Sequence, residues 1–176
     1  MVNIKKEREM REMMKSSKIY FAKVSPQGVI PSKREEDGAF DLYACFEEEY
    51  RMIQPHETVM IPTGIAAAFS SDYVAIIKER GSTGSKGIGH RCGVIDSGYR
   101  AEWFICITNH NTKPLVIAKP SVSNQFKDCI VYPYEKGIAQ CLMVEVPKLQ
   151  IEEIDYADLV KIESERGMGA LGSSGK

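Results

Sequence analysis

Short apolar runs separated by turn residues dominate the chain from residue 19 onward. Gly, Pro, Ser and Asp stand between the runs, and no amphipathic segment of helical period separates one run from the next. Short strands at close spacing without intervening helices predict an all-β domain, either a sandwich or a barrel. The predicted strands are 19–24, 40–46, 58–61, 65–69, 73–78, 102–108, 114–118, 129–132 and 138–146.

Three segments depart from this pattern. Residues 3–17 are highly charged with a thin apolar stripe, which predicts a solvated helix. Residues 113–136 contain three prolines and exceed what a hairpin needs, so we expect an excursion from the sheet. The glycine-rich tail from Arg166 is expected to order only on a ligand. The predicted organisation is a helical extension at 1–18, a β domain at 19–162 and an arm at 163–176.

Composition limits the kinds of partner. A chain of 176 residues, 43% hydrophobic and 27% charged, is long enough for one domain with a real core. A net charge of −1 gives no general attraction to nucleic acid or to an anionic membrane. Five cysteines without a C-x-x-C pair are typical of reduced thiols in the cytosol, and no apolar run approaches a membrane span. We expect a cytoplasmic protein that binds neither nucleic acid nor membrane.

Two clusters of Gly, Ser and Arg could bind phosphate. Residues 80–87 follow a predicted strand, and their glycines let backbone N–H groups converge while Arg80 and Lys86 add charge. This is not a Walker A loop, because the glycine-to-lysine spacing differs and no helix is expected to follow. The run from Arg166 repeats the same chemistry. Each cluster alone could be a surface loop or a disordered terminus, but together they suggest one polyphosphate held from two sides.

The stretch from Gly93 to Arg100 contains an acid where an apolar strand meets a turn. Val94 and Ile95 predict a short buried strand, after which Asp96 would be partly desolvated and rigid, as suits a general base. The alternative is an Asp that hydrogen-bonds its own turn. The histidines lack zinc-ligand spacing, and no Ser or Cys has nucleophile-elbow surroundings. Catalysis would therefore use a water activated by a carboxylate, with Mg²⁺ carried by phosphates.

Taken in order, five segments resemble the five motifs of the trimeric dUTP pyrophosphatases (dUTPases). The resemblance runs from about Ile19 to the C-terminus and leaves out the predicted helix and the 113–136 segment. It implies a jelly-roll-like β-barrel of the β-clip type, a homotrimer with three shared active sites, and dUTP as substrate. The matching segments are Asp37–Leu42, Arg80–Lys86, Gly93–Arg100, Gly137–Gln140 and Arg166–Gly175, of which the third is the most specific.

The resemblance also implies a role for individual residues. Asp96 would activate the water that attacks the α-phosphorus, Tyr99 would pack on the deoxyribose, and Asp41 would support Mg²⁺ through water while the triphosphate holds the ion. Uracil would be read by the hairpin 88–95, with His90, Val94 and Ile95. The remaining substrate contacts would be Arg80, Gly81, Ser82, Thr83, Gln140 and Arg166, and, in the arm that covers the nucleotide, Leu171, Gly172, Ser173 and Ser174.

The chain departs from the family pattern at four positions. Gly81 stands where the family usually has Ser, Gly98 replaces a second Asp, His90 replaces an Asn, and Leu171 replaces an aromatic residue. None of these changes removes Asp96. The resemblance therefore implies a divergent but active member that forms dUMP and pyrophosphate.

Two other functions stay open. A dCTP deaminase, or a bifunctional deaminase, would share the fold but needs a Glu in a strand where this chain has Ile105, Cys106 and Ile107. A module that senses nucleotide or binds a partner would use the surfaces of the predicted helix and of 113–136. The presence of Asp96 and of the whole tail favours turnover over sensing.

Overall fold

The structure is a computed structural model that describes residues 18–91 and 93–169. The helix predicted over 3–17 and the arm residues 171–174 lie outside the described part. The chain divides into two compact units, Met1–Val146 and Pro147–Lys176, and each is described by itself. Pro147–Ile162, which we expect in the β domain, groups instead with the C-terminal unit.

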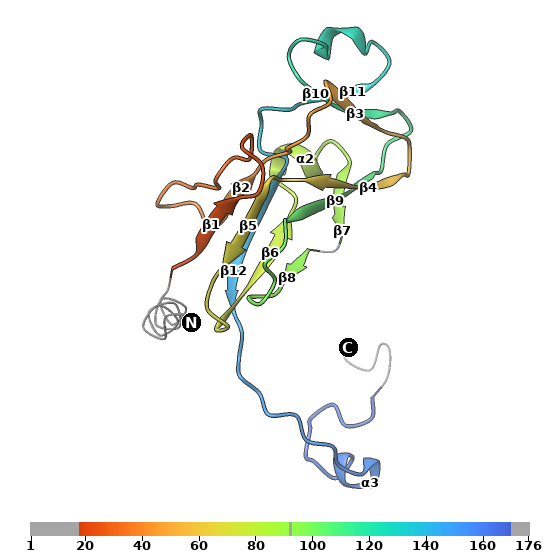
Figure 1. Ribbon diagram of the computed structural model, residues 1–176. Helices are drawn as coiled ribbons and strands as arrows, with labels where there is room; N and C mark the ends of the chain where they lie inside the picture. Colours follow the sequence, from red (N-terminus) through yellow and green to blue (C-terminus); the bar gives the residue numbers. More distant parts are fainter. Residues whose placement is uncertain (1–17, 92, 170–176) are drawn as a thin grey trace, which may run out of the picture. The chain divides into compact units, whose positions relative to one another are not determined.

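Nearly all regular structure in the described part of the first unit is β-strand (Figure 1), so the all-β class is confirmed. The strands form four small sheets, and none of them closes into a ring among the described residues. Every pairing is antiparallel except that of β10 with β11. The sheets are β1 (Tyr20–Lys23) with β5 (Ile65–Ala68); β11 (Ile130–Pro133), β10 (Leu115–Ala118) and β3 (Tyr50–Ile53); β2 (Phe40–Leu42), β12 (Ala139–Glu145), β6 (Tyr73–Lys78) and β8 (Val94–Ile95); β4 (Thr58–Pro62), β9 (Phe104–Asn109) and β7 (Ile88–Arg91).

The predicted strand 40–46 is wrong in its second half. β2 ends at Leu42, and the apolar residues after it continue as a loop that is buried in the core. The backbone of this loop bonds to neighbouring segments: Cys45 N–H donates to Pro62 O at 2.8 Å, and Phe46 N–H donates to the Tyr134 hydroxyl at 3.3 Å. The apolar run therefore signalled burial rather than pairing. The pattern also missed β3, a strand whose second and fourth residues alone point inward.

Residues 113–136 are only partly the excursion that the sequence predicts. β10 is buried along its whole length and pairs with both β3 and β11, so both strands of this segment belong to a sheet. Only residues 119–129 project, and they contain the 3-10 helix η1 (Ser123–Gln125) at the top of Figure 1. Lys119 Nζ donates to Glu47 O at 2.6 Å, and the Phe126 ring lies 4.7 Å from that of Tyr50. These contacts fix the base of the projection.

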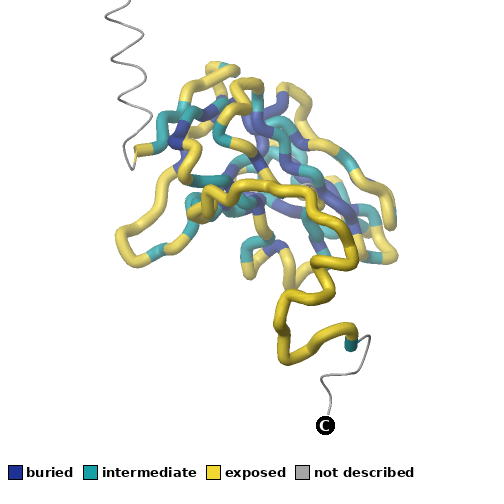
Figure 2. Tube along the Cα trace, turned by 90° about the horizontal axis from the view of Figure 1, so that it is seen from below, coloured by how far each residue is buried: buried dark blue, intermediate teal, exposed yellow. Residues whose placement is uncertain are grey.

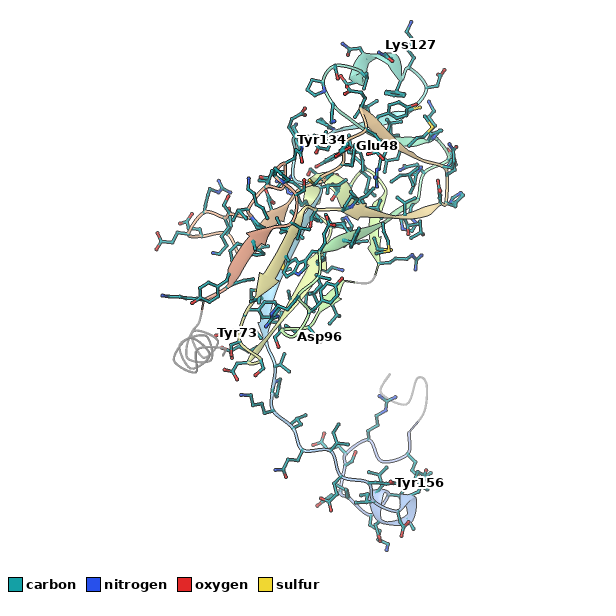
Figure 3. The ribbon with its side chains drawn as sticks, viewed as in Figure 1. Glu48, Tyr73, Asp96, Lys127, Tyr134 and Tyr156 are labelled. Atoms are coloured by element: carbon teal, nitrogen blue, oxygen red, sulfur yellow. The ribbon has the colours of Figure 1, made fainter. Side chains whose placement is uncertain are left out.

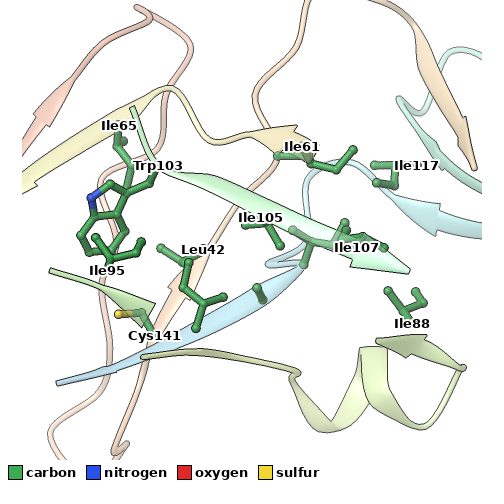
Figure 4. Close-up of a cluster of buried hydrophobic side chains, with 14 of the residues drawn as sticks. Leu42, Ile61, Ile65, Ile88, Ile95, Trp103, Ile105, Ile107, Ile117 and Cys141 are labelled. Carbon is green, nitrogen blue, oxygen red and sulfur yellow. The ribbon is translucent and has the colours of Figure 1, made fainter. Parts of the chain in front are cut away.

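The core of the first unit is built around β9 and the residue that precedes it (Figure 4). Trp103, Ile105 and Ile107 are completely buried, and the Trp103 ring contacts the edge of Phe21 at 5.6 Å between centroids. Side chains from all four sheets meet in this cluster, so burial of apolar surface is what joins the sheets.

The described residues of the second unit are almost entirely exposed (Figure 2). They contain one turn of helix, α3 (Tyr156–Leu159), which the sequence pattern did not predict. No helix in the described part of the chain is long and apolar enough to cross a membrane.

Because Ile105 is fully buried at the centre of this cluster, Ile105→Ala should lower the free energy of unfolding by about 2–5 kcal/mol. Urea unfolding at one protein concentration measures this change. The control is Met52→Ala, an exposed position on β3, which should change the free energy by about 0.5 kcal/mol or less. Equal effects of the two substitutions would contradict the assignment of the core.

Candidate functional site

The first Gly/Ser cluster contains a helical turn, α2 (Gly81–Gly84), where we expect only a loop. The Thr83 side chain closes this turn: its hydroxyl accepts the Arg80 N–H at 3.0 Å and lies 3.1 Å from Arg80 O, to which it donates. Thr83 is fully buried and is therefore not available to a ligand. Gly81 and Ser82 are exposed, and their backbone N–H groups have no protein acceptor among the described residues. They are the free donors of the cluster.

Arg80 is held by two acceptors from other segments. Its Nε lies 2.8 Å from Asp41 Oδ1, and its Nη1 donates to Gly137 O at 2.8 Å. Tyr132, a buried residue of β11, donates its hydroxyl to the same carbonyl at 2.7 Å. A guanidinium has five N–H donors, so three remain for a ligand once these two are used. Arg80 is thus aligned by the protein and still able to bind an anion.

The close approach of Gly137 to Asp41 explains why glycine stands there. A Cβ on Gly137 would lie 3.1 Å from both Cβ and Cγ of Asp41, so a larger residue would displace the carboxylate. Three residues further on, Gln140 pairs with Asp41 in the β2–β12 register and donates Nε2 to Glu79 O at 2.7 Å. The segment 137–140 therefore packs against the Asp41 carboxylate and places the Gln140 side-chain amide near Arg80.

A polar cleft of about 820 Å³ has Asp41, Arg80 and Gln140 in its lining. The loop before β2 also lines it, and in this loop Arg34 and Asp37 form an ion pair at 2.9 Å. Hydrogen bonds from Arg34 hold the pKa of the Asp37 carboxyl below its usual value. The cleft brings together three of the predicted segments, with Asp41, Arg80, Gly81, Ser82 and Gln140 all in its lining.

Asp96 lies elsewhere, in a smaller hollow of about 200 Å³ that it shares with Tyr99, Met60, Val94, Ile95 and Phe104. Figure 3 labels Asp96. Its carbonyl accepts the Tyr99 N–H at 3.0 Å, and the Tyr99 hydroxyl donates to Glu102 O at 3.1 Å. Two expectations need correction. Asp96 is exposed in the single chain rather than partly desolvated, and Val94 is 66% exposed, so only Ile95 of the predicted buried strand is buried.

No residue lines both hollows. A single chain therefore presents the acid with its aromatic neighbour in one place and the phosphate-type donors in another.

The side chain of His90 is turned inward, so it cannot contact a base as we expect. It is 2% exposed, its ring nitrogens have no hydrogen-bond partner among the described residues, and Nδ1 lies 3.9 Å from Glu79 Oε1. Burial lowers the pKa of this imidazole, although the neighbouring Glu79 charge opposes the shift. The backbone N–H of His90 is not free either, because it donates to Glu79 Oε1 at 2.8 Å.

Glu79 is a residue of this region that the sequence analysis did not single out. Its Oε1 accepts the His90 N–H at 2.8 Å. Burial raises the pKa of Glu79, but hydrogen bonds from the His90 amide, its own amide and Lys78 outweigh burial and set the pKa to about 2. The only feature of the sequence that could have pointed to Glu79 is its place directly before the Gly/Ser cluster.

Of the predicted substrate contacts in the arm, only Arg166 falls in the described part. It belongs to the second unit, where its Nε donates to Gly169 O at 3.0 Å. Leu171, Gly172, Ser173 and Ser174 lie outside the described residues, so their predicted contacts stay predictions.

Because the pKa values of both His90 and Glu79 are lowered on folding, the protein should lose stability in acid. The unfolded chain protonates His90 near its ordinary pKa of 6.5, whereas the folded chain does so only at lower pH, so stability present above pH 6.5 is lost as the pH falls. Glu79 also lowers stability as the pH falls, between its ordinary pKa of 4.5 and its folded pKa of about 2.

Urea unfolding at two pH values, one above and one below 6.5, measures the effect of His90. His90→Gln should lose less stability between them than the unsubstituted protein, whereas His56→Asn, which removes an exposed imidazole, should lose as much. An identical loss in all three proteins would contradict the role of His90.

Known proteins of one family match most of this chain. The dUTPase family model matches residues 26–175. The deoxyuridine 5'-triphosphate nucleotidohydrolase of Neisseria meningitidis serogroup C is 30% identical over 83% of this chain and 87% of its own. The protein of the same name from Bordetella pertussis is 31% identical over 77% and 80%.

Solved structures share the fold. A dUTPase of Staphylococcus bacteriophage 80alpha, solved with dUpNHpp, superposes with a TM-score of 0.72 at 19% identity, covering 92% of this chain and 100% of that one. The EIAV dUTPase gives 0.60 at 19% identity, with 79% and 98% covered. From the family match and the curated relatives, the chain belongs to the dUTPase family.

Proposed function

We propose that this protein hydrolyses dUTP to dUMP and pyrophosphate, which keeps uracil out of DNA and supplies dUMP. Family membership supports the reaction, and the curated relatives carry the name of this activity. The observation that carries the proposal is the cleft in which Arg80, aligned by Asp41 and Gly137, stands beside the free amides of Gly81 and Ser82. Such an arrangement is suited to a polyphosphate.

Asp96 is the proposed general base. Its carboxylate would take a proton from a water as that water forms a bond to the α-phosphorus, and the bond from this phosphorus to the bridging oxygen of pyrophosphate would break. The exposure of Asp96 supports this role, because its oxygens are open to water. Tyr99, in the same hollow, would pack against the deoxyribose, and the backbone of 88–95 would read uracil.

The cleft would bind the leaving group. The three remaining N–H groups of Arg80, the amides of Gly81 and Ser82, and the Gln140 side chain are donors for charge that builds on pyrophosphate. Arg166 would add a second guanidinium. With Leu171, Gly172, Ser173 and Ser174, the 163–176 arm would cover the nucleotide and exclude water during turnover.

The residues at the cleft fit Mg²⁺ that arrives with the nucleotide. In residues 18–91 and 93–169, no three His, Cys, Asp or Glu side chains gather as a metal cage. Mg²⁺ is commonly held by one or two carboxylates, waters and substrate phosphates, and Asp41 supplies one carboxylate beside Arg80. When bound, the ion would neutralise charge on the triphosphate. Asp41 would contact it through water with Oδ2, since Oδ1 is paired with Arg80.

A homotrimer with shared active sites is part of the proposal. Asp96 and the phosphate donors line different hollows of one chain, so the hollow of one copy needs the cleft of another to form a complete site. The exposed apolar side chains of Met60 and Val94 next to Asp96 support a partner surface there. Location in the cytoplasm stays a prediction.

Light scattering tests the assembly. The protein should have the mass of three chains, and mixing Asp96→Asn with Arg80→Ala protein after dissociation and reassociation should restore part of the activity, because some shared sites then contain neither substitution. A monomeric protein with full activity would contradict shared sites.

Pyrophosphate release from dUTP, dCTP, dUDP and dTTP tests the reaction. We expect release from dUTP alone, and a loss of at least about a hundredfold in Asp96→Asn, since a positioned base typically contributes that much. Asp128→Asn, an exposed carboxylate on the projecting loop, is the matched control and should keep full activity. Ammonia release from dCTP would instead favour a deaminase, and tight dUTP binding without turnover would favour a sensor.

A further inference from the structure

Glu79 contacts three segments that the proposed function uses. It follows β6 and directly precedes Arg80. Its carboxylate accepts the N–H of His90 in β7 at 2.8 Å, and its carbonyl accepts Nε2 of Gln140 in β12 at 2.7 Å. A Cβ on Gly84 would lie 3.4 Å from Glu79 Cβ, so turn α2 packs closely over this side chain.

The bond to His90 is of the stronger, charge-assisted kind. The pKa of Glu79 is about 2, so the carboxylate is ionised at neutral pH. Lys78 Nζ lies 3.3 Å from the other oxygen, Oε2, which leaves Oε1 to the amide. The buried His90 imidazole at 3.9 Å has a lowered pKa and does not compete as a cation near pH 7.

We propose that Glu79 is a positioning residue for dUTP hydrolysis, which fixes the spacing between the proposed uracil-reading segment 88–95 and the phosphate-binding loop of each chain. This segment is not the expected hairpin, because β7 pairs with β9 and β8 pairs with β6. The inference rests on the proposed function. Neither Asp96 nor the proposed phosphate ligands are altered by changing the Glu79 side chain, so its effect would come from the bond to the segment 88–95.

Because the proposed sites are shared between copies, the spacing within each chain would affect every site. In the proposed trimer each site would take its phosphate-binding loop from one copy and its segment 88–95 from another. The distance between this loop and this segment within a chain would then set the dimensions of every site in the ring. Displacement of either segment by about 1 Å weakens contacts to substrate strongly. Because base and phosphate contacts already form in the bound substrate, the loss should appear in KM more than in kcat.

The test compares Glu79→Ala and Glu79→Gln with the matched control Glu57→Ala. Glu57 makes the same kind of bond: its carboxylate accepts the Gln54 N–H at 2.7 Å, at a turn outside both hollows. Glu79→Ala should raise KM for dUTP by about tenfold, the worth of one charge-assisted hydrogen bond, and change kcat by less than about threefold. Glu79→Gln should stay within about threefold of the unsubstituted KM, because its amide oxygen still accepts the His90 N–H.

Glu57→Ala should lower the Tm and leave KM unchanged, which separates positioning from general stability. If Glu79→Ala does not fold, Glu79→Asp replaces it, since the shorter side chain keeps the charge but withdraws the acceptor. An unchanged KM in Glu79→Ala, an equal rise in Glu57→Ala, or no rescue by Glu79→Gln would overturn the inference.

A failure of the proposed function can be distinguished from a failure of the positioning role of Glu79. If the unsubstituted protein releases no pyrophosphate, the binding constant of dUpNHpp takes the place of KM, and Glu79→Ala should weaken it by about tenfold. A protein that neither hydrolyses dUTP nor binds dUpNHpp would overturn both proposals.

Discussion

The alignment of Arg80 by Asp41 and by the Gly137 carbonyl is the constraint on which the phosphate cleft depends. It is possible because β2, β12 and β6 are neighbours in one sheet, so the residues at their ends meet. The ion pair is about one-third exposed, and such pairs contribute little to stability. Its value is that a guanidinium already held in place loses less entropy when it binds a phosphate.

The segment 113–136 helps to hold the Gly137 carbonyl that aligns Arg80. Its strand β11 carries Tyr132, which is buried and donates to the same Gly137 carbonyl that Arg80 uses. Lys86, just after turn α2, lies 5.6 Å above the Tyr132 ring, where a cation is attracted to the aromatic face. Strand β11 therefore contacts both the Gly137 carbonyl and Lys86, while residues 119–129 extend away from the β3–β10–β11 sheet.

Because the two hollows are separate, one chain would not be a complete enzyme in the proposed reaction. β8 pairs with the middle of β6 at Ala75 and Ile76, whereas turn α2 follows the end of β6 after Lys78. Asp96 and Arg80 are thereby fixed on different parts of the same sheet. Glu79 links the end of β6 to His90 in β7, a strand of a different sheet, and in the proposed trimer this bond would set part of the geometry of a shared site inside each chain.

The sequence by itself determined the all-β class, most strands, and the ordered segments that identify the family, because turn residues and spacing are local properties. Tertiary structure alone decided which candidates can meet a ligand. Thr83 and His90 match positions expected to bind substrate, yet packing turns both side chains inward, while Glu79 gains its contacts only through folding. Likewise, the apolar residues 43–46 are expected in a strand but lie in a loop packed into the core. Val94 is expected to be buried but is exposed. Both differences arise because burial depends on neighbours that are distant in the sequence.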